Sequence, residues 1–281
     1  MKIGGLEQSA GTARGSVAAA TALRRVRGMA LALTALLASW IVAGRLRAVV
    51  DYPVMHRLDR FARVVPALDR ALLWTTTYYM LTGVVLMACV WYCWFDRPDT
   101  ATRARLLAGT VAAFSAGLGG RALQLLLPTH LRPMHDPALG MTLPDGVDPA
   151  ALNHWSSFPS DHAAVQFGLA TVVLLASPAL GRAMLVWVAL LNAARVYLGV
   201  HFPTDITGGA ALGVLAVLLA GTAPAATAAR AALRWERRAP GRFYLLAFFL
   251  SYQIATLFDE ARTVGAATVG LLRSLLAGRA A

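Results

Sequence analysis

Two histidines of this sequence stand where their chemistry could be used. His162 and His201 each lie at the junction between a polar segment and a long apolar run. An imidazole exchanges protons near neutral pH, so each ring could act as an acid, a base or a nucleophile. Asp205 follows His201 by four residues. A carboxylate that accepts the Nδ1–H of an imidazole fixes the tautomer in which Nε2 is free to attack.

Two arginines and one helix start indicate that the group attacked is a phosphate. Arg132 and Arg195 are permanent cations whose planar donor forks match phosphate oxygens. An arginine in the last turns of an apolar run, as Arg195 is, is costly unless it faces a polar cavity or a partner, the alternative being that its side chain reaches out to the lipid headgroups. Ser160 is expected to cap a helix that begins at Asp161, and the N–H groups of a helix start favour an anion. Ser160 and Asp161 are therefore counted with the two arginines as predicted phosphate-binding residues.

The elements that must position these residues are membrane helices. The chain has 281 residues, of which 58% are hydrophobic and 14% are charged, whereas soluble domains have about 25% charged residues. Six runs approach the roughly 20 apolar residues that a spanning helix needs, at 28–44, 71–95, 106–127, 162–180, 183–200 and 206–223. We predict an all-α membrane bundle of about six transmembrane helices. Alternating spans would bring all the residues above to one face of the membrane.

The charges around the runs predict the orientation. Arg24, Arg25 and Arg27 precede the first run, which favours a signal anchor over a cleaved signal peptide. With the N-terminus inside, the inner segments carry more Lys and Arg than the outer ones, so the site is expected at the outer interface. The arginine-rich segment 45–70 opposes this assignment. Its apolar stripe, formed by Val50, Val54, Leu58 and Phe61, recurs at helical spacing, and we interpret the segment as an amphipathic stretch on the outer surface.

The chain is divided into three parts on this basis. Residues 1–27 are expected to form a disordered cytoplasmic N-terminus, and residues 28–223 the six-span domain. Residues 224–281 combine a basic segment with short apolar or amphipathic helices. The apolar run from Phe243 to Phe258 is short for a span. It could cross the membrane, lie in the interface or pack on the bundle.

Composition also restricts the partners. A net charge of +12 could serve nucleic acid, an anionic membrane surface or a phosphorylated substrate, and the long apolar runs disfavour nucleic acid. Cys89 and Cys93 share one helix face as small buried hydrophobes, without a disulfide or zinc pattern. The spacing of His130, His135 and Asp136 matches no metal motif. We therefore expect no metal and no cofactor.

The polar segments resemble the motifs of the type 2 phosphatidic acid phosphatase superfamily, whose site is shared with vanadium haloperoxidases. Its three motifs are Lys, six residues, Arg-Pro; then Pro-Ser-x-His; then Arg, five residues, His, three residues, Asp. The chain has Arg132-Pro133, Pro159-Ser160-Asp161-His162, and Arg195, His201 and Asp205 at full spacing. The lysine position of the first motif holds Leu125. Arg121 lies four residues earlier, on the same helix face, and is expected to replace the lysine.

The resemblance implies a metal-independent membrane phosphatase and a role for each residue. His201 would attack phosphorus and become phosphohistidine, with Asp205 orienting the ring. His162 would protonate the leaving oxygen and then activate water. The phosphate oxygens would be held by Arg132, Arg195, Ser160 and backbone N–H groups, which suits a reaction governed by positioning and charge stabilisation.

The expected substrate is a lipid-linked phosphate. The Pro-Ser-Asp-His form of the second motif resembles undecaprenyl-diphosphatases of the bacitracin-resistance type. That resemblance implies a bacterial inner membrane protein whose site faces the periplasm. Phosphatidate, phosphatidylglycerophosphate and lipid A phosphates remain open. A haloperoxidase is disfavoured by the six spans, whereas a lipid-binding or transport protein with a relict site stays an alternative.

Overall fold

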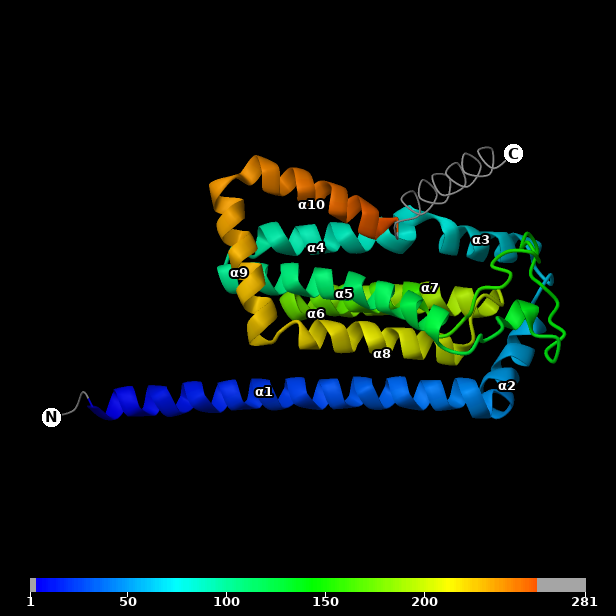
Figure 1. Ribbon diagram of the computed structural model, residues 1–281, viewed down its shortest axis with the longest axis horizontal. Helices are drawn as coiled ribbons and strands as arrows, with labels where there is room; N and C mark the ends of the chain where they lie inside the picture. The colour runs from blue at the N-terminus through cyan, green and yellow to red at the C-terminus, as the bar shows by residue number, and fades with distance from the viewer. Residues whose placement is uncertain (1–3, 257–281) are drawn as a thin grey trace, which may run out of the picture.

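The computed structural model describes the backbone of residues 4–256, with side chains from residue 21 onward except at Ala223. Within this range the chain is helical and has no β-strand (Figure 1), which confirms the predicted all-α class. The elements are α1 (Gly4–Ile41), η1 (Val42–Leu46), α2 (Arg47–Asp59), α3 (Pro66–Thr77), η2 (Met80–Val84), α4 (Val85–Asp96), α5 (Thr100–Leu126), η3 (Pro133–His135), α6 (Asp161–Ala176), α7 (Pro178–Tyr197), α8 (Pro203–Leu219), α9 (Ala223–Arg238) and α10 (Pro240–Ala255).

The predicted spans each overlap a different helix or bent helix pair. Among the described residues, three continuous helical stretches are long and apolar enough to cross a membrane, at Thr21–Asp59, Thr100–Leu126 and Pro178–Tyr197. Two more qualify as bent pairs, Pro66–Thr77 with Met80–Asp96 and Pro203–Leu219 with Pro224–Arg238. The remaining predicted span corresponds to α6, a shorter apolar helix of 16 residues. It ends at Ala176 rather than near residue 180 because Pro178 begins the next helix.

Helices α5, α6, α7 and α8 lie side by side as the centre of the bundle (Figure 1). Small residues allow the backbones to approach closely, as is usual between membrane helices. A Cβ atom at Gly213 of α8 would lie 2.0 Å from the carbonyl oxygen of Ala164, and one at Gly209 would lie 2.2 Å from that of Ser160. Glycine at 209 therefore lets α8 pack directly against the second motif.

The span formed by α3 and α4 is broken, with a bend of 55° and the π-helical turn η2 at the break. Backbone carbonyls at such a break need partners, since lipid offers none. The carbonyl oxygens of Thr76, Leu81 and Thr82 accept hydrogen bonds from Arg195, Trp187 and Gln166 at 3.0, 3.0 and 3.1 Å. Side chains of α6 and α7 thus supply the partners that these carbonyl groups need, and one of them is the motif residue Arg195.

The N-terminal part differs from the prediction in two respects. Residues 4–27 belong to the helix α1 rather than to a disordered segment. In α2 the buried side chains are Asp51 and Met55, whereas Val50 and Val54 of the predicted apolar stripe are exposed. Figure 1 shows α2 turning from the line of α1 across the end of the bundle. The face of α2 that carries Asp51 and Met55 therefore packs over the end of the bundle where the motifs lie (Figure 1).

The C-terminal helices close the opposite end. The amphipathic helix α9 crosses the ends of the central helices, and α10 runs back beside α4 (Figure 1). Phe243 and Ile254 of α10 are buried in the same apolar core as Leu86 and Trp94 of α4. As far as residue 256, the run from Phe243 therefore packs on the bundle. Residues 257–281, which complete that run and the predicted third part, lie outside the described residues.

Candidate active site

A cavity of about 660 Å³ lies at the end of the bundle that α2 covers. Its walls come from α3, η2, the end of α5, the loop 127–160, the start of α6, and the end of α7 with the turn after it. Six of the eight predicted site residues line it: Arg121, Arg132, Asp161, His162, Arg195 and His201. Ser160 and Asp205 are fully buried, each beside His201. The structure thus brings the three polar segments together.

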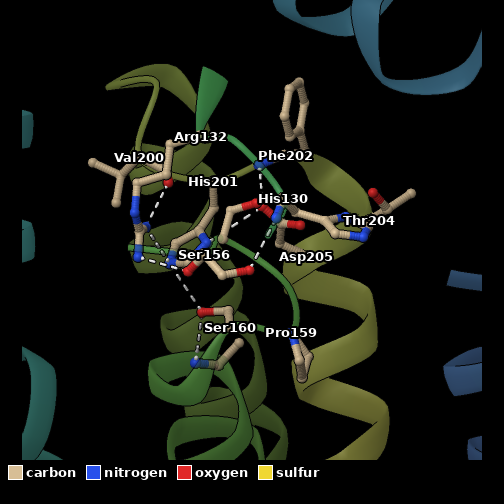
Figure 2. Close-up of polar contacts among 12 residues, drawn as sticks. His130, Arg132, Ser156, Pro159, Ser160, Val200, His201, Phe202, Thr204 and Asp205 are labelled. Atoms are coloured by element: carbon tan, nitrogen blue, oxygen red, sulfur yellow. Dashed lines mark hydrogen bonds and ion pairs between the residues drawn. The ribbon is translucent and has the colours of Figure 1, made fainter. Parts of the chain in front are cut away.

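His201 lies in the turn between α7 and α8 and is 2% exposed. Its Nε2 is 3.3 Å from Ser160 Oγ and 3.4 Å from an Arg132 Nη1 atom (Figure 2). A guanidinium only donates, so its contact favours an unprotonated Nε2. The ring proton then sits on Nδ1. Burial lowers the pKa of His201 below its usual value, which keeps the ring neutral at neutral pH.

Asp205 lies beside the Nδ1–H of His201. Its Oδ2 lies 3.4 Å from His201 Nδ1 and accepts a hydrogen bond of 2.8 Å from the backbone N–H of Phe202. Within the described residues, His201 Nδ1 and Asp205 Oδ1 each lack a hydrogen-bond partner of good geometry. The two side chains are therefore adjacent, but the geometry between them is not that of a close hydrogen bond.

Arg132 and Arg195 are both buried, and each is partly satisfied by backbone carbonyls. Arg132 donates to the carbonyl oxygens of Val200 at 2.8 Å and Ser156 at 3.3 Å (Figure 2). Arg195 donates to Thr76 at 3.0 Å, at the end of α3. The Nε atoms of both arginines have no hydrogen-bond partner among the described residues. A buried cationic N–H without a partner is unfavourable, and a phosphate oxygen would supply one.

The second motif forms the start of α6 as predicted. Ser160 is its N-cap, and its Oγ accepts a hydrogen bond from the backbone N–H of Ala163 at 3.3 Å. The backbone N–H of Ser160 donates to the carbonyl oxygen of Asp205 at 3.0 Å. This bond ties the second motif to the third and fixes the helix start beside His201.

Sequence reasoning missed how Asp161 is used. Its Oδ1 accepts hydrogen bonds from both the backbone N–H and the ring Nδ1 of His162, at 2.8 and 2.9 Å. The contact leaves Nε2 of His162 for the cavity that both residues line. The site therefore contains two imidazole–carboxylate pairs. For the His162–Asp161 pair, the sequence offers one signal, which is that the two residues are adjacent in the chain.

Arg121 lies in the cavity wall, whereas Leu125 does not line the cavity and is 74% exposed. The guanidinium carbon of Arg121 is 3.7 Å from the centre of the Trp155 ring. Arg121 Nη1 donates to Gln124 Oε1 at 2.7 Å, and Gln124 Nε2 donates to the carbonyl oxygen of Pro159 at 2.7 Å. Arg121 is thus joined to the second motif through Gln124, one helical turn from the position of the family lysine.

The other polar residues of the outer loop brace α2 rather than gather as a metal site. Arg47 contacts His130 Nδ1 at 3.0 Å and Asp136 at 3.5 Å, and Tyr52 donates to Asp136 at 2.7 Å. The described residues contain no group of three or more His, Cys, Asp or Glu side chains placed to hold a metal ion. Burial lowers the pKa of His130, so this contact with Arg47 involves a neutral ring.

Known proteins resemble this chain in sequence and in structure. The model of the PAP2 superfamily matches residues 71–227. The bacitracin transport permease protein BcrC of Bacillus licheniformis is 38% identical over 63 residues, which are 22% of this chain and 31% of that protein. A crystal structure of the transmembrane PAP2-type phosphatidylglycerolphosphate phosphatase of Bacillus subtilis superposes with a TM-score of 0.47 at 20% identity, over 67% of this chain and 92% of that one.

The range matched by the family model is more than half of the chain. It contains every residue of the three motifs and all the helices that carry them. The predicted resemblance is confirmed: this integral membrane protein belongs to the PAP2 superfamily.

Proposed function

We propose that the protein is a membrane phosphatase that hydrolyses a lipid-linked phosphate or diphosphate through a phosphohistidine at Nε2 of His201. The observation that carries this proposal is the pair of buried Nε–H groups on Arg132 and Arg195. Both residues line the cavity of His201, and neither Nε has a partner among the described residues. Two guanidinium groups with unpartnered N–H donors can bind an oxyanion. The neutral imidazole beside them can act as the nucleophile.

The first step forms a bond between His201 Nε2 and phosphorus and breaks the bond from phosphorus to the leaving oxygen. Positive charge develops on the imidazole, and the carboxylate of Asp205 beside Nδ1 balances it. The ring of His162 is held by the contact of its Nδ1 with Asp161. Its Nε2–H donates a proton to the leaving oxygen. Charge on the transferring oxygens is stabilised by the guanidinium groups of Arg132 and Arg195.

The second step returns the enzyme to its starting state. His162 has lost its proton and can take one from a water molecule, which attacks phosphorus. The bond from phosphorus to Nε2 of His201 breaks, and inorganic phosphate leaves. We assign Asp161 to the orientation of His162 rather than to phosphate binding, since a carboxylate only accepts hydrogen bonds and this one is engaged with the ring.

Polyprenyl diphosphate, with undecaprenyl diphosphate as its long bacterial form, is the proposed substrate. Arg121, Arg132 and Arg195 all line one cavity, and a diphosphate gains more from three cations than a monoester does. Its leaving group is a lipid monophosphate, which departs more readily than an alkoxide. Apolar cavity residues such as Leu73 and Leu152 suit the first part of a lipid tail. The bacitracin name of the Bacillus licheniformis relative agrees with the resemblance of the second motif.

The proposed location is a bacterial inner membrane with the cavity facing the periplasm. The support is the excess of Lys and Arg in the segments at the α9 end of the bundle. An outward site would meet lipid diphosphates in the outer leaflet while their tails stay in the bilayer.

Phosphate release from purified protein in one detergent tests the proposal. Undecaprenyl diphosphate, farnesyl diphosphate, phosphatidate and phosphatidylglycerophosphate are compared at matched concentration, with His201→Ala as the blank. We expect the highest kcat/KM for undecaprenyl diphosphate, because the bound tail helps to position the phosphate. A tenfold preference for either glycerophospholipid would overturn the polyprenyl assignment alone. The absence of release from all four would favour the lipid-binding or transport alternative.

A further inference from the structure

A second cavity, of about 290 Å³, lies at the other end of the bundle. It is enclosed by the first third of α5, the last turns of α6 and α8, and α1 around residues 21–25. Arg105, which lines it, is near the start of α5, whereas Arg121 of the active site is near its end. Figure 1 shows these two ends of α5 at opposite sides of the molecule. The cavity is therefore separate from the catalytic one.

The rim of this cavity is cationic. Arg24, Arg25 and Arg105 line it, and none of the described residues in its wall is an Asp or a Glu. None of the three forms an ion pair with a described residue. The acidic residue close to Arg105 is Asp99, whose carboxylate caps α5 by accepting from Thr102 N at 2.8 Å. Three positive charges thus face one small volume, and the described residues place no carboxylate in its wall.

Hydrogen bonds hold two of these arginines in place. Arg25 Nη1 donates to the carbonyl oxygen of Gly221 at 2.7 Å, which joins α1 to the end of α8 and closes one side of the cavity. Arg105 Nη2 donates to Thr102 Oγ1 at 2.8 Å. Arg24 and Arg105 are exposed, whereas Arg25 is half-buried. The cations are therefore positioned at an open rim, where a ligand can approach from the membrane surface.

The interior of the cavity is apolar. Below the arginines its walls are Leu106, Gly109, Val172, Leu175, Ala176, Val217 and Leu218. Cations at the helix ends lie at headgroup level, and aliphatic side chains deeper in the bundle lie at hydrocarbon level. This is the polarity profile of a phospholipid. The volume is at the small end of ligand sites, roughly 300–1,000 Å³, so it suits a headgroup and the start of one acyl chain.

We propose that this cavity binds the headgroup of an anionic phospholipid, with the phosphate on Arg24 and Arg105 and the beginning of an acyl chain against the walls of α5, α6 and α8. Charge complementarity selects an anionic over a zwitterionic lipid, because the described rim residues include three arginines and no carboxylate. The site requires neither His201 nor any other residue of the active site, so the proposal stands independently of the enzymatic one.

Native mass spectrometry of the full chain in detergent tests this proposal. Phosphatidylglycerol, phosphatidylcholine and inorganic phosphate are titrated separately into the wild type, into the double variant Arg24→Gln/Arg105→Gln and into the control Arg27→Gln. Arg27 is an exposed arginine of the same helix that does not line the cavity. All three proteins keep the catalytic residues, so binding elsewhere cancels in the comparison. The altered residues are exposed, and thermal unfolding checks that each variant folds.

We expect the double variant to bind phosphatidylglycerol at least about tenfold more weakly than the wild type and Arg27→Gln do, with phosphatase turnover unchanged. Equal affinity of the double variant and the wild type would overturn the proposal. So would equal binding of phosphatidylcholine and phosphatidylglycerol by the wild type. Inorganic phosphate that binds as well as phosphatidylglycerol would show a small-anion site and would refute the lipid assignment.

Discussion

Asp51 accepts two hydrogen bonds from Thr204, at 3.2 Å from its backbone N–H and at 2.6 Å from its hydroxyl. Both residues are buried. Asp51 belongs to α2, outside the range that the family model matches, whereas Thr204 is in the first turn of α8 and directly precedes Asp205. A carboxylate that receives the free N–H groups of a helix start holds that turn in place. Helix α2 thus stabilises the first turn of α8, which carries Asp205 beside His201.

Asp51→Ala is therefore expected to lower kcat by about tenfold or more, with a smaller change in KM. The loss of a helix cap costs about 1 kcal/mol, and Asp205 gains freedom to move from His201 Nδ1. Asp51→Asn keeps an acceptor for Thr204 and should retain more activity. The measurements are kcat, KM and thermal unfolding, with Val50→Ala as the control at an exposed position of the same helix. If Asp51→Ala loses stability but keeps its kcat, the contact only supports the fold.

Alanine variants of His201 and His162 are expected to lose activity in different ways. His201→Ala is expected to lose turnover by several orders of magnitude, because the covalent step stops. His162→Ala should lose about 10²–10⁴-fold, as expected for a missing general acid and base. In that variant an acid-labile phosphoenzyme should accumulate where breakdown is slowed more than formation. Trapping with labelled substrate measures both effects, and near-normal turnover by His201→Ala would refute the histidine mechanism.

A pH dependence of turnover follows from the burial of His201, the proposed nucleophile. His201 must be neutral to attack, and burial lowers its pKa from the usual 6.5. Protonation therefore begins only at lower pH, and the acidic limb of kcat/KM should lie below pH 6.5. The Asp205 carboxylate raises this pKa and the Arg132 cation lowers it. Asp205→Asn should thus move the residual acidic limb down in pH and Arg132→Gln should move it up. Shifts of the same sign in both variants would contradict the assignment.

Arg121 and Trp155 are expected to act as a unit. Arg121→Ala should reduce kcat/KM by about 10²-fold, the order of one charge-assisted phosphate contact. Trp155→Ala should cost less, because the ring only holds the guanidinium, and Trp155→Phe should retain most activity. Trp74→Ala, at an exposed tryptophan of α3 outside the cavity wall, is the matched control.

A lysine placed at position 125, where the family motif has one, should restore little of the activity lost in Arg121→Ala. Leu125 is exposed and does not line the cavity, so a lysine there would begin one helical turn beyond Arg121, outside the cavity wall. Leu125→Lys in the Arg121→Ala background is expected to restore little of the lost kcat/KM. Full activity of Arg121→Ala itself would show that the arginine has a purely structural role.

The convergence of the motifs was predictable, because alternation of spans places their ends on known sides. The Ser160 cap was predictable because its cause is local. The buried face of α2 was not. In a membrane protein lipid accepts apolar side chains such as Val50, so the apolar stripe does not mark the inside. The polar Asp51 is buried instead, since it finds its partner Thr204 there. Periodicity alone also gave no sign of the bend between α3 and α4.

Activity is expected to survive excess EDTA, and orthovanadate should inhibit as a mimic of pentacoordinate phosphorus. Arg121, Arg132 and Arg195 line the cavity, and in the proposed mechanism they supply the positive charge that phosphoryl transfer requires. The carboxylates of Asp161 and Asp205 are each turned toward an imidazole, at 2.9 and 3.4 Å, rather than gathered as the oxygen ligands that Mg²⁺ prefers. Arg195→Gln should weaken vanadate inhibition together with turnover, because both depend on the same oxyanion contacts. Turnover is measured after dialysis against EDTA and after addition of single divalent ions. Complete loss that one such ion restores would mean that a metal, and not the arginine pair, carries the charge of the transferring phosphate.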